Sequence, residues 1–574
     1  MILFTDRRRG NVKILKRLKY ISHYELWMFA VVAIAAVLRF VLIYSNWPIT
    51  DADEGNMGVL ALHVAFQGDH PSFFYGGAYL GPLEGYAAAP LFRLFGTSLF
   101  ALRLPLVLFF IGFLISMFYL VRLLYSEKFA LATVILLSLG SPDVLFLQLR
   151  ASGEYPEIEM FAALICLLAV WLALSSHRIG QERWKRLVIY GLLGLIVGLA
   201  LWVDLLILPF VAAAGLLLWL FCRRELLGLS GLSLLLGIIV GGFPQIYYNL
   251  TAPLLQNSLI ILMNIHHGGA QDMVVRHLTW VNQLTGTLFV ALPMATGGSM
   301  HCPLSAIPPS GSPTPATLPC VLLEGGWGAG YLILWFVAVC LAVSAIWRYR
   351  RHLRADMTQG ISLEERQEAI RQYGRLMLLT SAGLTLVLYA VAPASATGPD
   401  TTFRYLTCLL LAIPALLWPL WQNLNLQKIS NWRTKAGLLL SGGLLLLVTA
   451  TFVNGMVGTF MQIHTAQDVY QYEETLVRDL QQVGATRVYS DYATCNVITF
   501  LSQEKVICSA VDERLQPGYD RYVAYHSIVQ AAPHPTYVFP PNTKQAEALK
   551  QRVLLASSHY RQYKIEAYVV YQVT

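Results

Sequence analysis

Residues 25–44, ELWMFAVVAIAAVLRFVLIY, form an apolar run of twenty residues, and residues 49–55, ITDADEG, follow closely behind it. An α-helix of about twenty apolar residues is as long as the hydrocarbon core of a bilayer is thick. The run therefore predicts a transmembrane helix. Asp51, Asp53 and Glu54 come where that helix leaves the membrane. A carboxylate at such an edge stays ionised only where water, a cation or hydrogen-bond donors reach it.

The rest of the chain has the composition of a membrane protein. Of its 574 residues, 56% are hydrophobic and only 13% are charged, about half the charge of a typical soluble chain. Apolar runs of similar length recur, which predicts a mainly α polytopic membrane protein with about eleven transmembrane helices. The predicted spans are residues 25–45, 100–121, 129–148, 158–175, 187–203, 205–221, 226–246, 327–347, 376–393, 405–422 and 437–460.

Lys and Arg are distributed unevenly between the predicted loops. With a cytoplasmic N-terminus, the inside segments hold about 25 of these residues and the outside loops about 5, as the positive-inside rule requires. The net charge of +8 therefore indicates topology and requires no nucleic-acid partner. This topology makes residues 1–24 a basic cytoplasmic segment and residues 25–464 the membrane domain, with long outer loops at 45–99 and 250–326.

Beyond the last span the composition becomes polar. Residues 465–574 predict a small extracytoplasmic α/β domain, with no dinucleotide-binding glycine motif and no catalytic constellation of its own. Its expected helices are residues 468–483 and 543–557, and its expected strands are 487–490, 505–509, 537–539 and 567–573. Four cysteines fall outside the spans in two local pairs. In an oxidising compartment these predict the disulfides Cys302–Cys320 and Cys495–Cys508.

The acidic stretch allows two interpretations. Asp and Thr favour helix N-termini, so the stretch could simply cap a helix. A carboxylate at the mouth of a membrane cavity is also well suited to act as a general base for a hydroxyl. The residues alone leave both interpretations open.

Glu84 lies further along the first outer loop, among aromatic side chains that include Tyr75 and Tyr79. Helical periodicity at 58–66 and 83–95 predicts two amphipathic helices in this loop. An aromatic wall with one carboxylate suits sugar binding, but aromatic side chains also anchor loops at the membrane interface.

Two arginines of the predicted outer loops lie beside the ends of predicted transmembrane spans. Arg150 precedes Glu154 and Tyr155, and Arg404 precedes Tyr405. Such an Arg could pair with neighbouring acids or snorkel at a span end. It could also bind a phosphate at the headgroup plane.

His266 and His267, followed by Asp272, suggest a metal site in the second long loop. Adjacent His side chains seldom converge on one ion without a tight turn. We therefore assign no metal ligand and no cofactor, with a divalent cation as the alternative.

Together these patches resemble the GT-C glycosyltransferases. In particular they are similar to glycosyltransferase family 39, which includes protein O-mannosyltransferases and bacterial transferases that put aminoarabinose on lipid A. Asp53-Glu54 after the first span resembles the acidic signature of this family. Residues 74–84, residues 153–157 and Arg404-Tyr405 are similar to segments of bacterial relatives. The resemblance covers the membrane domain and is weakest across residues 250–326.

The resemblance implies a polyprenyl-phosphate-linked sugar as donor and an acceptor at the outer face of a plasma (inner) membrane. Asp53 matches the base position, Glu54 is its neighbour, and Asp51 is an additional carboxylate that leaves the choice of base open. Arg150 and Arg404, with Tyr405, occupy suitable places for the donor phosphate. The remaining candidate substrate-binding residues are Glu84, Tyr75, Tyr79, Glu154, Tyr155 and His266.

The chemistry agrees with this expectation. A phospholipid-linked sugar has an acidic leaving group, so one carboxylate that deprotonates an acceptor hydroxyl is sufficient and no general acid is needed. A glycosidase would need two carboxylates in distinct roles. We expect an inverting hexosyl- or pentosyltransferase whose acceptor is a glycan, lipid or protein. The alternative is a polytopic transporter or lipid flippase, which would need ionisable groups deep in several spans or broken helices at the midplane.

Overall fold

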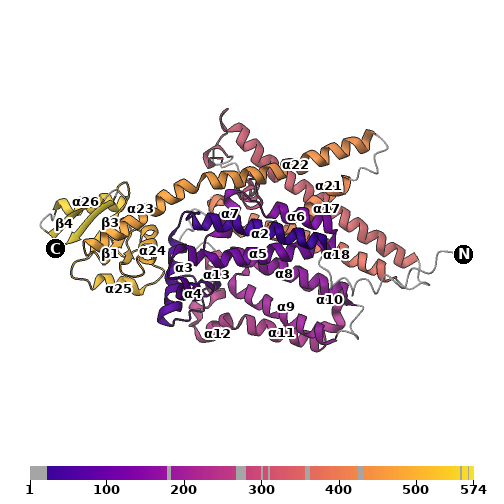
Figure 1. Cartoon of the computed structure of the whole chain (residues 1–574), viewed down its shortest axis with the longest axis horizontal. Coiled ribbons are helices and arrows are strands. Elements are labelled where there is room, and N and C mark those ends of the chain that lie inside the picture. Colours follow the sequence, from indigo (N-terminus) through magenta and orange to yellow (C-terminus); the bar gives the residue numbers. More distant parts are fainter. Residues whose placement is uncertain are drawn as a thin grey trace.

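A bundle of long helices and a small C-terminal α/β domain at one of its ends make up the molecule (Figure 1). The computed structural model describes residues 22–176, 183–266, 279–298, 302–307, 311–355, 362–424, 432–555, 559–565 and 568–574. Helix α22 (Trp432–Met461) leaves the bundle, and α23 (Ile463–Gln482) continues into the domain. We call the end of the bundle that carries this domain the domain end.

The described residues include nine helices that are long and apolar enough to cross a membrane, or up to eleven if each of two bent pairs forms one span. The expected fold class is confirmed, because each predicted run corresponds to one of these elements. The nine are His23–Tyr44 (α2), Leu99–Leu124 (α5), Tyr155–Leu174 (α8), Arg183–Val203 (α9), Leu205–Leu226 (η4 and α10), Leu318–Tyr349 (in α17), Leu363–Ala390 (α18), Pro399–Asn423 (α20, η9 and α21) and Lys435–Gln482 (α22 and α23). The bent pairs are Glu127–Leu137 with Pro142–Leu149 (α6 and α7, 86°) and Leu229–Gly241 with Phe243–Thr251 (α11 and α12, 63°).

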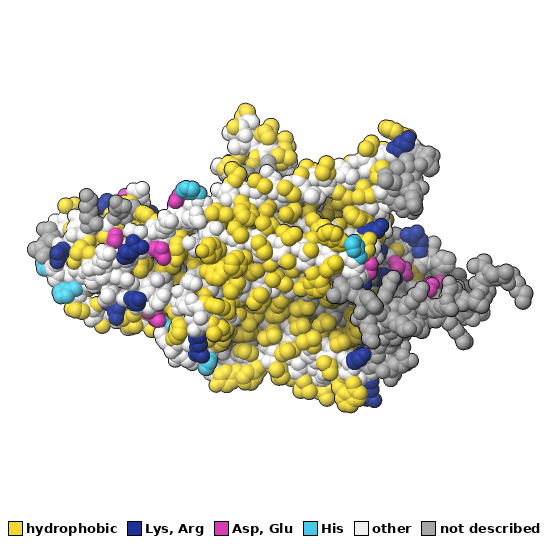
Figure 2. All heavy atoms as spheres, in the orientation of Figure 1, with side chains coloured by type: hydrophobic (Ala, Val, Ile, Leu, Met, Phe, Trp, Pro, Cys, Tyr) yellow, Lys and Arg dark blue, Asp and Glu magenta, His cyan; other side chains and the backbone are white. Residues whose placement is uncertain are grey.

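Hydrophobic side chains cover the middle of the bundle, whereas charged side chains gather on the C-terminal domain and toward the opposite end (Figure 2). Two buried arginines inside the bundle have specific partners. Arg39 donates to the Ser138 carbonyl at 2.9 Å and to Gln148 Oε1 at 3.0 Å, beside the bend between α6 and α7. Arg186 and Glu225 form a second buried ion pair. The Arg39 side chain thus links the end of α6 to α7 across the first bend.

The loop between α2 and α5 covers the domain end of the bundle. It contains α3 (Ala52–Leu62), the π-helical turn η2 (His63–Gln67) and α4 (Leu83–Phe95), so the prediction of two helices in this loop is confirmed. In Figure 1, α3 and α4 lie between the bundle and the C-terminal domain. This position places the acidic stretch at the junction of the two parts.

The C-terminal domain contains a five-stranded mixed sheet in the order β2-β1-β3-β5-β4. Strand β1 is parallel to β2 and β3, and β5 is antiparallel to β3 and β4. The strands are β1 (Arg487–Ser490), β2 (Ile507–Ala510), β3 (Thr536–Phe539), β4 (Tyr560–Ile565) and β5 (Tyr568–Val573), and the helices that follow α23 are α24 (Tyr492–Leu501), α25 (Ala524–Gln530) and α26 (Lys544–Leu555). The expected strands and helices are present, but the sequence analysis did not predict α24, α25 or β4.

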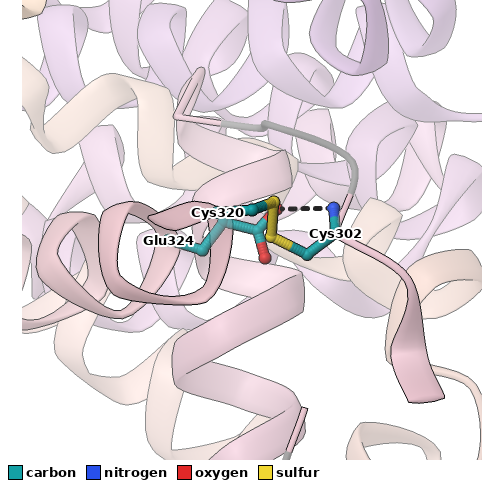
Figure 3. A group of neighbouring side chains, drawn as sticks. All are labelled: Cys302, Cys320 and Glu324. Carbon is teal, nitrogen blue, oxygen red and sulfur yellow. Dashed lines mark hydrogen bonds between the residues drawn. A yellow bond between two sulfur atoms is a disulfide. The ribbon is translucent and has the colours of Figure 1, made fainter. Parts of the chain in front are cut away.

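Both predicted disulfides are present. Cys495–Cys508 joins α24 to β2. Cys302–Cys320 joins the second long loop to the start of α17, beside the buried Glu324 (Figure 3). Glu324 Oε1 accepts the Cys302 backbone N–H at 3.3 Å. The two disulfides fasten one segment in each part of the molecule.

Candidate functional site

Helix α3 begins in the acidic stretch, and the first carboxylate of that stretch caps the helix. Asp51 is the N-cap residue, and its Oδ1 accepts the Glu54 backbone N–H at 2.9 Å. Asp53 and Glu54 follow in the first turn, where the helix dipole favours negative charge. Each of the three carboxylates pairs with a different arginine, and the three arginines come from three separate elements.

Glu54 is fully buried and points into the bundle. Arg103 of α5 donates to it through two nitrogens, Nε to Oε1 at 2.8 Å and Nη2 to Oε2 at 2.5 Å. The Ala151 backbone N–H donates to Oε1 at 2.9 Å. Because its lone pairs are occupied and solvent does not reach it, Glu54 is suited to fastening α3 to α5. We propose no catalytic role for Glu54.

Asp51 pairs with Arg150, whose Nη1 lies 2.7 Å from Asp51 Oδ2. The Arg150 guanidinium also donates to Ser152 Oγ at 3.3 Å and lies 3.8 Å from the centroid of the Phe146 ring. Burial raises the pKa of the Asp51 carboxyl, while the Arg150 charge opposes that rise. Arg150 is therefore already committed to a carboxylate, which weakens its candidacy for a donor phosphate.

Asp53 faces the C-terminal domain. Arg521, which lies shortly before α25, donates to Asp53 Oδ1 through Nη2 at 2.7 Å and Nε at 3.0 Å. Tyr492, the first residue of α24, donates its hydroxyl to the same oxygen at 3.1 Å. Oδ2 accepts no hydrogen bond within the described part of the chain. The Asp53 side chain is 21% exposed, so its free oxygen can be reached from solvent.

The domain that was expected to carry no catalytic constellation thus supplies two side chains to the candidate base. Glycines allow this approach. A Cβ at Gly55 would lie 2.6 Å from the Asn496 carbonyl carbon, and one at Gly58 would overlap the Phe500 ring. Helix α24 therefore packs directly on α3. Gly55 and Gly58, spaced three residues apart after the acidic stretch, were the one sequence signal for a close helix partner.

A second group of acidic side chains lies deeper, around the start of α8. Glu84 is fully buried on the first turn of α4, and one of its oxygens accepts the Gly153 N–H at 2.9 Å. Burial raises the pKa of Glu84 well above its ordinary value, and the neighbouring Glu157 adds to the rise. The second oxygen, Oε1, is buried and has no hydrogen-bond partner among the described residues.

Glu154 caps α8 in an unusual backbone conformation. Its φ is +65°, a region that non-glycine residues seldom occupy and that occurs preferentially at functional sites. Burial and the nearby Asp204 raise the pKa of Glu154, and Arg404 lowers it. Tyr155, the next residue, is almost completely buried. Glu154 Oε2 is buried without a hydrogen-bond partner among the described residues.

Arg404 and Tyr405 begin the ten-residue 3₁₀ helix η9 (Phe403–Ala412). A 3₁₀ run of this length is uncommon, because its hydrogen bonds have poorer geometry than those of an α-helix. The Arg404 guanidinium lies 5.6 Å from the centroid of the Tyr405 ring. Arg404 forms no ion pair within the described ranges, and its Nε is buried without a hydrogen-bond partner. Of the two candidate cations, Arg404 is the one that forms no ion pair with a described residue, although its charge interacts with the nearby Glu154.

Tyr79 lies between the Asp53 pair and this deeper group. Burial, followed by Tyr405 and Glu154, raises the pKa of Tyr79 to about 12, and Arg521 opposes the rise. The loop is held in place at Gly81, whose N–H donates to the Val203 carbonyl at 3.0 Å. A Cβ on Gly81 would lie 2.6 Å from the Trp202 carbonyl oxygen. Tyr79 thus interacts electrostatically with Arg521, the partner of Asp53, and with Glu154 of the deeper group.

Tyr75, another candidate from the sequence, belongs to a different group of side chains. The Tyr75 hydroxyl contacts His63 Nδ1 at 2.8 Å and Asp69 Oδ2 at 3.2 Å, in a network that extends to Glu504 of the C-terminal domain. The side chain of His266 lies outside the described residues, as do residues 267–278. The one cluster of potential metal ligands in the described ranges is Cys302, Cys320 and Glu324, in which the two sulfurs are bonded to each other.

Asp204, which follows α9, provides a pH test of this deeper group. Burial raises the pKa of Asp204 to about 7, so in the folded protein it binds a proton that the unfolded chain would have released. Folded-state stability therefore declines as the pH rises from about 4 to 7. Asp204→Asn should remove this decline and raise the melting temperature at pH 8. The gain is a few kcal/mol at most, since one pKa unit is worth about 1.4 kcal/mol.

Thermal unfolding of the purified protein between pH 4 and pH 8 measures this effect. The side-chain amide introduced by Asp204→Asn can still accept the Leu206 N–H, which Asp204 Oδ1 accepts at 2.6 Å. A pH profile parallel to that of the unaltered protein would contradict the expected protonation.

Comparison with solved structures identifies the fold. The chain is similar to ArnT from Cupriavidus metallidurans bound to undecaprenyl phosphate, with a TM-score of 0.52 and 14% identity over 95% of this chain and 98% of ArnT. The apo state of the same protein matches with a TM-score of 0.52 and 14% identity, over 96% of this chain and 98% of ArnT. No protein-family model matches the sequence, and no curated protein does either. At this identity the similarity concerns the fold, and it confirms the GT-C fold that the sequence resemblance implied.

Proposed function

We propose that this protein is an inverting glycosyltransferase that moves a sugar from a polyprenyl-phosphate donor to an acceptor hydroxyl. The observation that carries the proposal is Asp53, a partly exposed carboxylate with one oxygen held by Arg521 and Tyr492 and the other oxygen free. It lies on a fold shared with ArnT, which was solved with undecaprenyl phosphate bound.

In the proposed reaction Asp53 Oδ2 removes the proton of the acceptor hydroxyl. The acceptor oxygen then forms a bond to the anomeric carbon of the sugar, and the bond from that carbon to the phosphate oxygen breaks. Its electron pair remains on the polyprenyl phosphate, a stable anion that needs no general acid. The proton on Asp53 returns to water. Attack on the face opposite the leaving group inverts the anomeric centre.

Arg404 is the proposed cation for the donor phosphate. It forms no ion pair with a described residue, its Nε has no hydrogen-bond partner among them, and it lies near Glu154 of the deeper acidic group. A cation placed where negative charge accumulates stabilises the leaving phosphate. An apolar cavity of about 360 Å³ between α17, α21 and α22 suits part of an isoprenoid chain. Its lining includes Trp327, Tyr331, Leu416, Leu444, Val448 and Phe452.

The proposed orientation places the domain end, with residues 465–574, on the outer side of a plasma membrane. The basic segments toward the opposite end support this arrangement through the positive-inside rule. Hexosyl and pentosyl donors both fit the chemistry, and so do glycan, lipid and protein acceptors.

The test uses the purified full-length protein in lipid nanodiscs. The first probe is undecaprenyl phosphate, whose binding is measured by a thermal shift. The second is a panel of undecaprenyl-phosphate-linked mannose, glucose and aminoarabinose, with release of undecaprenyl phosphate measured in the presence of a bacterial membrane glycolipid extract and of peptides rich in Ser and Thr. Binding together with acceptor-dependent release supports the proposal. Absence of binding to undecaprenyl phosphate contradicts it.

Arg404→Gln should raise the dissociation constant for undecaprenyl phosphate about tenfold, because a charge-assisted contact to the phosphate is worth about 1.5–3 kcal/mol. Lys128→Gln is the matched control, since it removes an exposed positive charge at the opposite end of the bundle. Equal dissociation constants for the two variants would exclude Arg404 from the phosphate site.

A further inference from the structure

We propose that Arg521 and Tyr492 of the C-terminal domain are positioning residues for Asp53, so that the domain is a working part of the active site. This inference rests on the function proposed above and deepens it. The supporting observations are the direction of the contacts to Asp53, the rigid seating of Arg521 and the close packing of α24 on α3.

All three contacts from the domain to Asp53 reach the same oxygen. Arg521 Nη2, Arg521 Nε and the Tyr492 hydroxyl lie 2.7, 3.0 and 3.1 Å from Oδ1. Arg521 Nε and the Tyr492 oxygen are themselves 2.6 Å apart. A side chain held by one oxygen in this way cannot rotate freely, and its second oxygen is presented in one direction. A base must lie within hydrogen-bonding distance of the proton it removes, so a fixed Oδ2 favours transfer.

Residues of the first long loop also hold Arg521 in place. Its guanidinium lies 4.8 Å from the centroid of the Phe74 ring, and Nη1 donates to the Tyr75 carbonyl at 3.4 Å. The Tyr519 hydroxyl donates to the Gly76 carbonyl at 3.1 Å. Gly76 has a φ of +71°, and a Cβ there would lie 2.9 Å from Arg521 Cα. The loop and the domain therefore approach each other so closely at Gly76 that a larger side chain would not fit there.

Helix α24 holds Tyr492 in place relative to Asp53. It packs on α3 through Gly55 and Gly58, as described above, so the helix that carries Asp53 and the helix that carries Tyr492 are in direct contact. Asp491 caps α24, since its side chain accepts the Thr494 N–H at 3.0 Å. The disulfide Cys495–Cys508 ties α24 to the sheet. A contact built only for adhesion would not need three donors on one carboxylate oxygen.

The other charges near Asp53 are already neutralised by their own partners. Asp51 pairs with Arg150 and Glu54 pairs with Arg103. Arg521 is therefore the one guanidinium dedicated to Asp53 among the described residues. A membrane domain without its C-terminal domain would retain the base but lose the group that orients it.

The experiment compares Arg521→Gln, Arg521→Lys, Arg521→Ala and Tyr492→Phe in the full-length protein, and Tyr492→Phe, which removes one of the three donors to Oδ1, should lower kcat less than Arg521→Gln does. It uses the undecaprenyl-phosphate-linked sugar from the panel above that the unaltered protein turns over. Arg521→Gln should lower kcat about 100-fold, the loss expected for a misplaced reacting group. The KM for the donor should change less than about threefold, because Arg521 acts on the base and not on the donor. Arg521→Lys should recover part of the loss, and millimolar guanidinium should restore part of the activity of Arg521→Ala.

Arg487→Gln is the matched control, because Arg487 is an arginine of the same domain whose Nη1 donates to the carbonyl of the preceding residue, Thr486. Limited proteolysis of each variant reports whether the domain stays seated. An unchanged kcat in Arg521→Gln overturns the proposal, and so does a loss that appears only when the domain has become protease-sensitive.

Measurements of kcat in the Asp53→Asn variant distinguish a failure of this inference from a failure of the proposed function. If Asp53 is the base and Arg521 acts through it, adding Arg521→Gln to Asp53→Asn causes no further loss of kcat. If Asp53→Asn alone retains full turnover, Asp53 is not the base, and this inference fails together with that part of the proposed function. If Asp53→Asn is inactive and Arg521→Gln is fully active, only the role of Arg521 fails.

Discussion

Asp53→Asn is expected to lower the rate of sugar transfer about 1,000-fold and to leave the fold unchanged, since general-base catalysis contributes about 10²- to 10⁴-fold to a rate. The substitution removes the basic oxygen. Asn is isosteric with Asp, and its amide oxygen can still accept hydrogen bonds from Arg521 and Tyr492. Release of undecaprenyl phosphate from the active donor of the panel measures the loss, with the melting temperature as the measure of folding.

Asp51→Asn is the matched control, because Asp51 lies two residues earlier on the same helix start. Asn is as good a helix cap as Asp, so α3 should remain intact. The substitution removes the ion pair with Arg150. Because the Asp51 side chain is about one-third exposed, this loss should lower the transfer rate only a few-fold. If Asp51→Asn abolishes transfer and Asp53→Asn does not, the base is Asp51.

The second large effect concerns folding. Arg103→Gln should destabilise the protein by about 3–5 kcal/mol, the usual consequence of leaving one charge of a buried pair without its partner. Glu54 would then be an uncompensated carboxylate with no access to water. The melting temperature and the yield of folded protein in detergent measure the effect.

The double variant Arg103→Gln with Glu54→Gln tests the physical reason for this loss. Removing both charges should recover part of the stability, because two buried amides are less costly than one buried unpaired ion. Lys128→Gln serves as a control on an exposed charge. A double variant less stable than Arg103→Gln would show that the ion pair is not the source of the loss.

The sequence alone predicted the membrane fold because bilayer thickness dictates the length of each apolar run, and that length is visible without any tertiary information. Strands β1, β2, β3 and β5 of the C-terminal sheet were also visible, as short runs rich in Val, Tyr and Ile between turns, whereas β4 was not. Helix α24 was missed, although it is the element that places Tyr492 against Asp53. It is a ten-residue apolar segment, and a short apolar run does not distinguish a buried strand from a buried helix.

The acidic stretch shows most clearly what sequence could and could not determine. Three carboxylates within four residues indicated a site of interest at a membrane edge. Adjacent residues on a helix point in different directions, about 100° apart, so each carboxylate meets a different part of the fold. Tertiary contacts between residues distant in the chain therefore decided the roles. Glu54 meets Arg103 inside the bundle, Asp51 meets Arg150, and Asp53 meets Arg521, which lies 468 residues further along the chain.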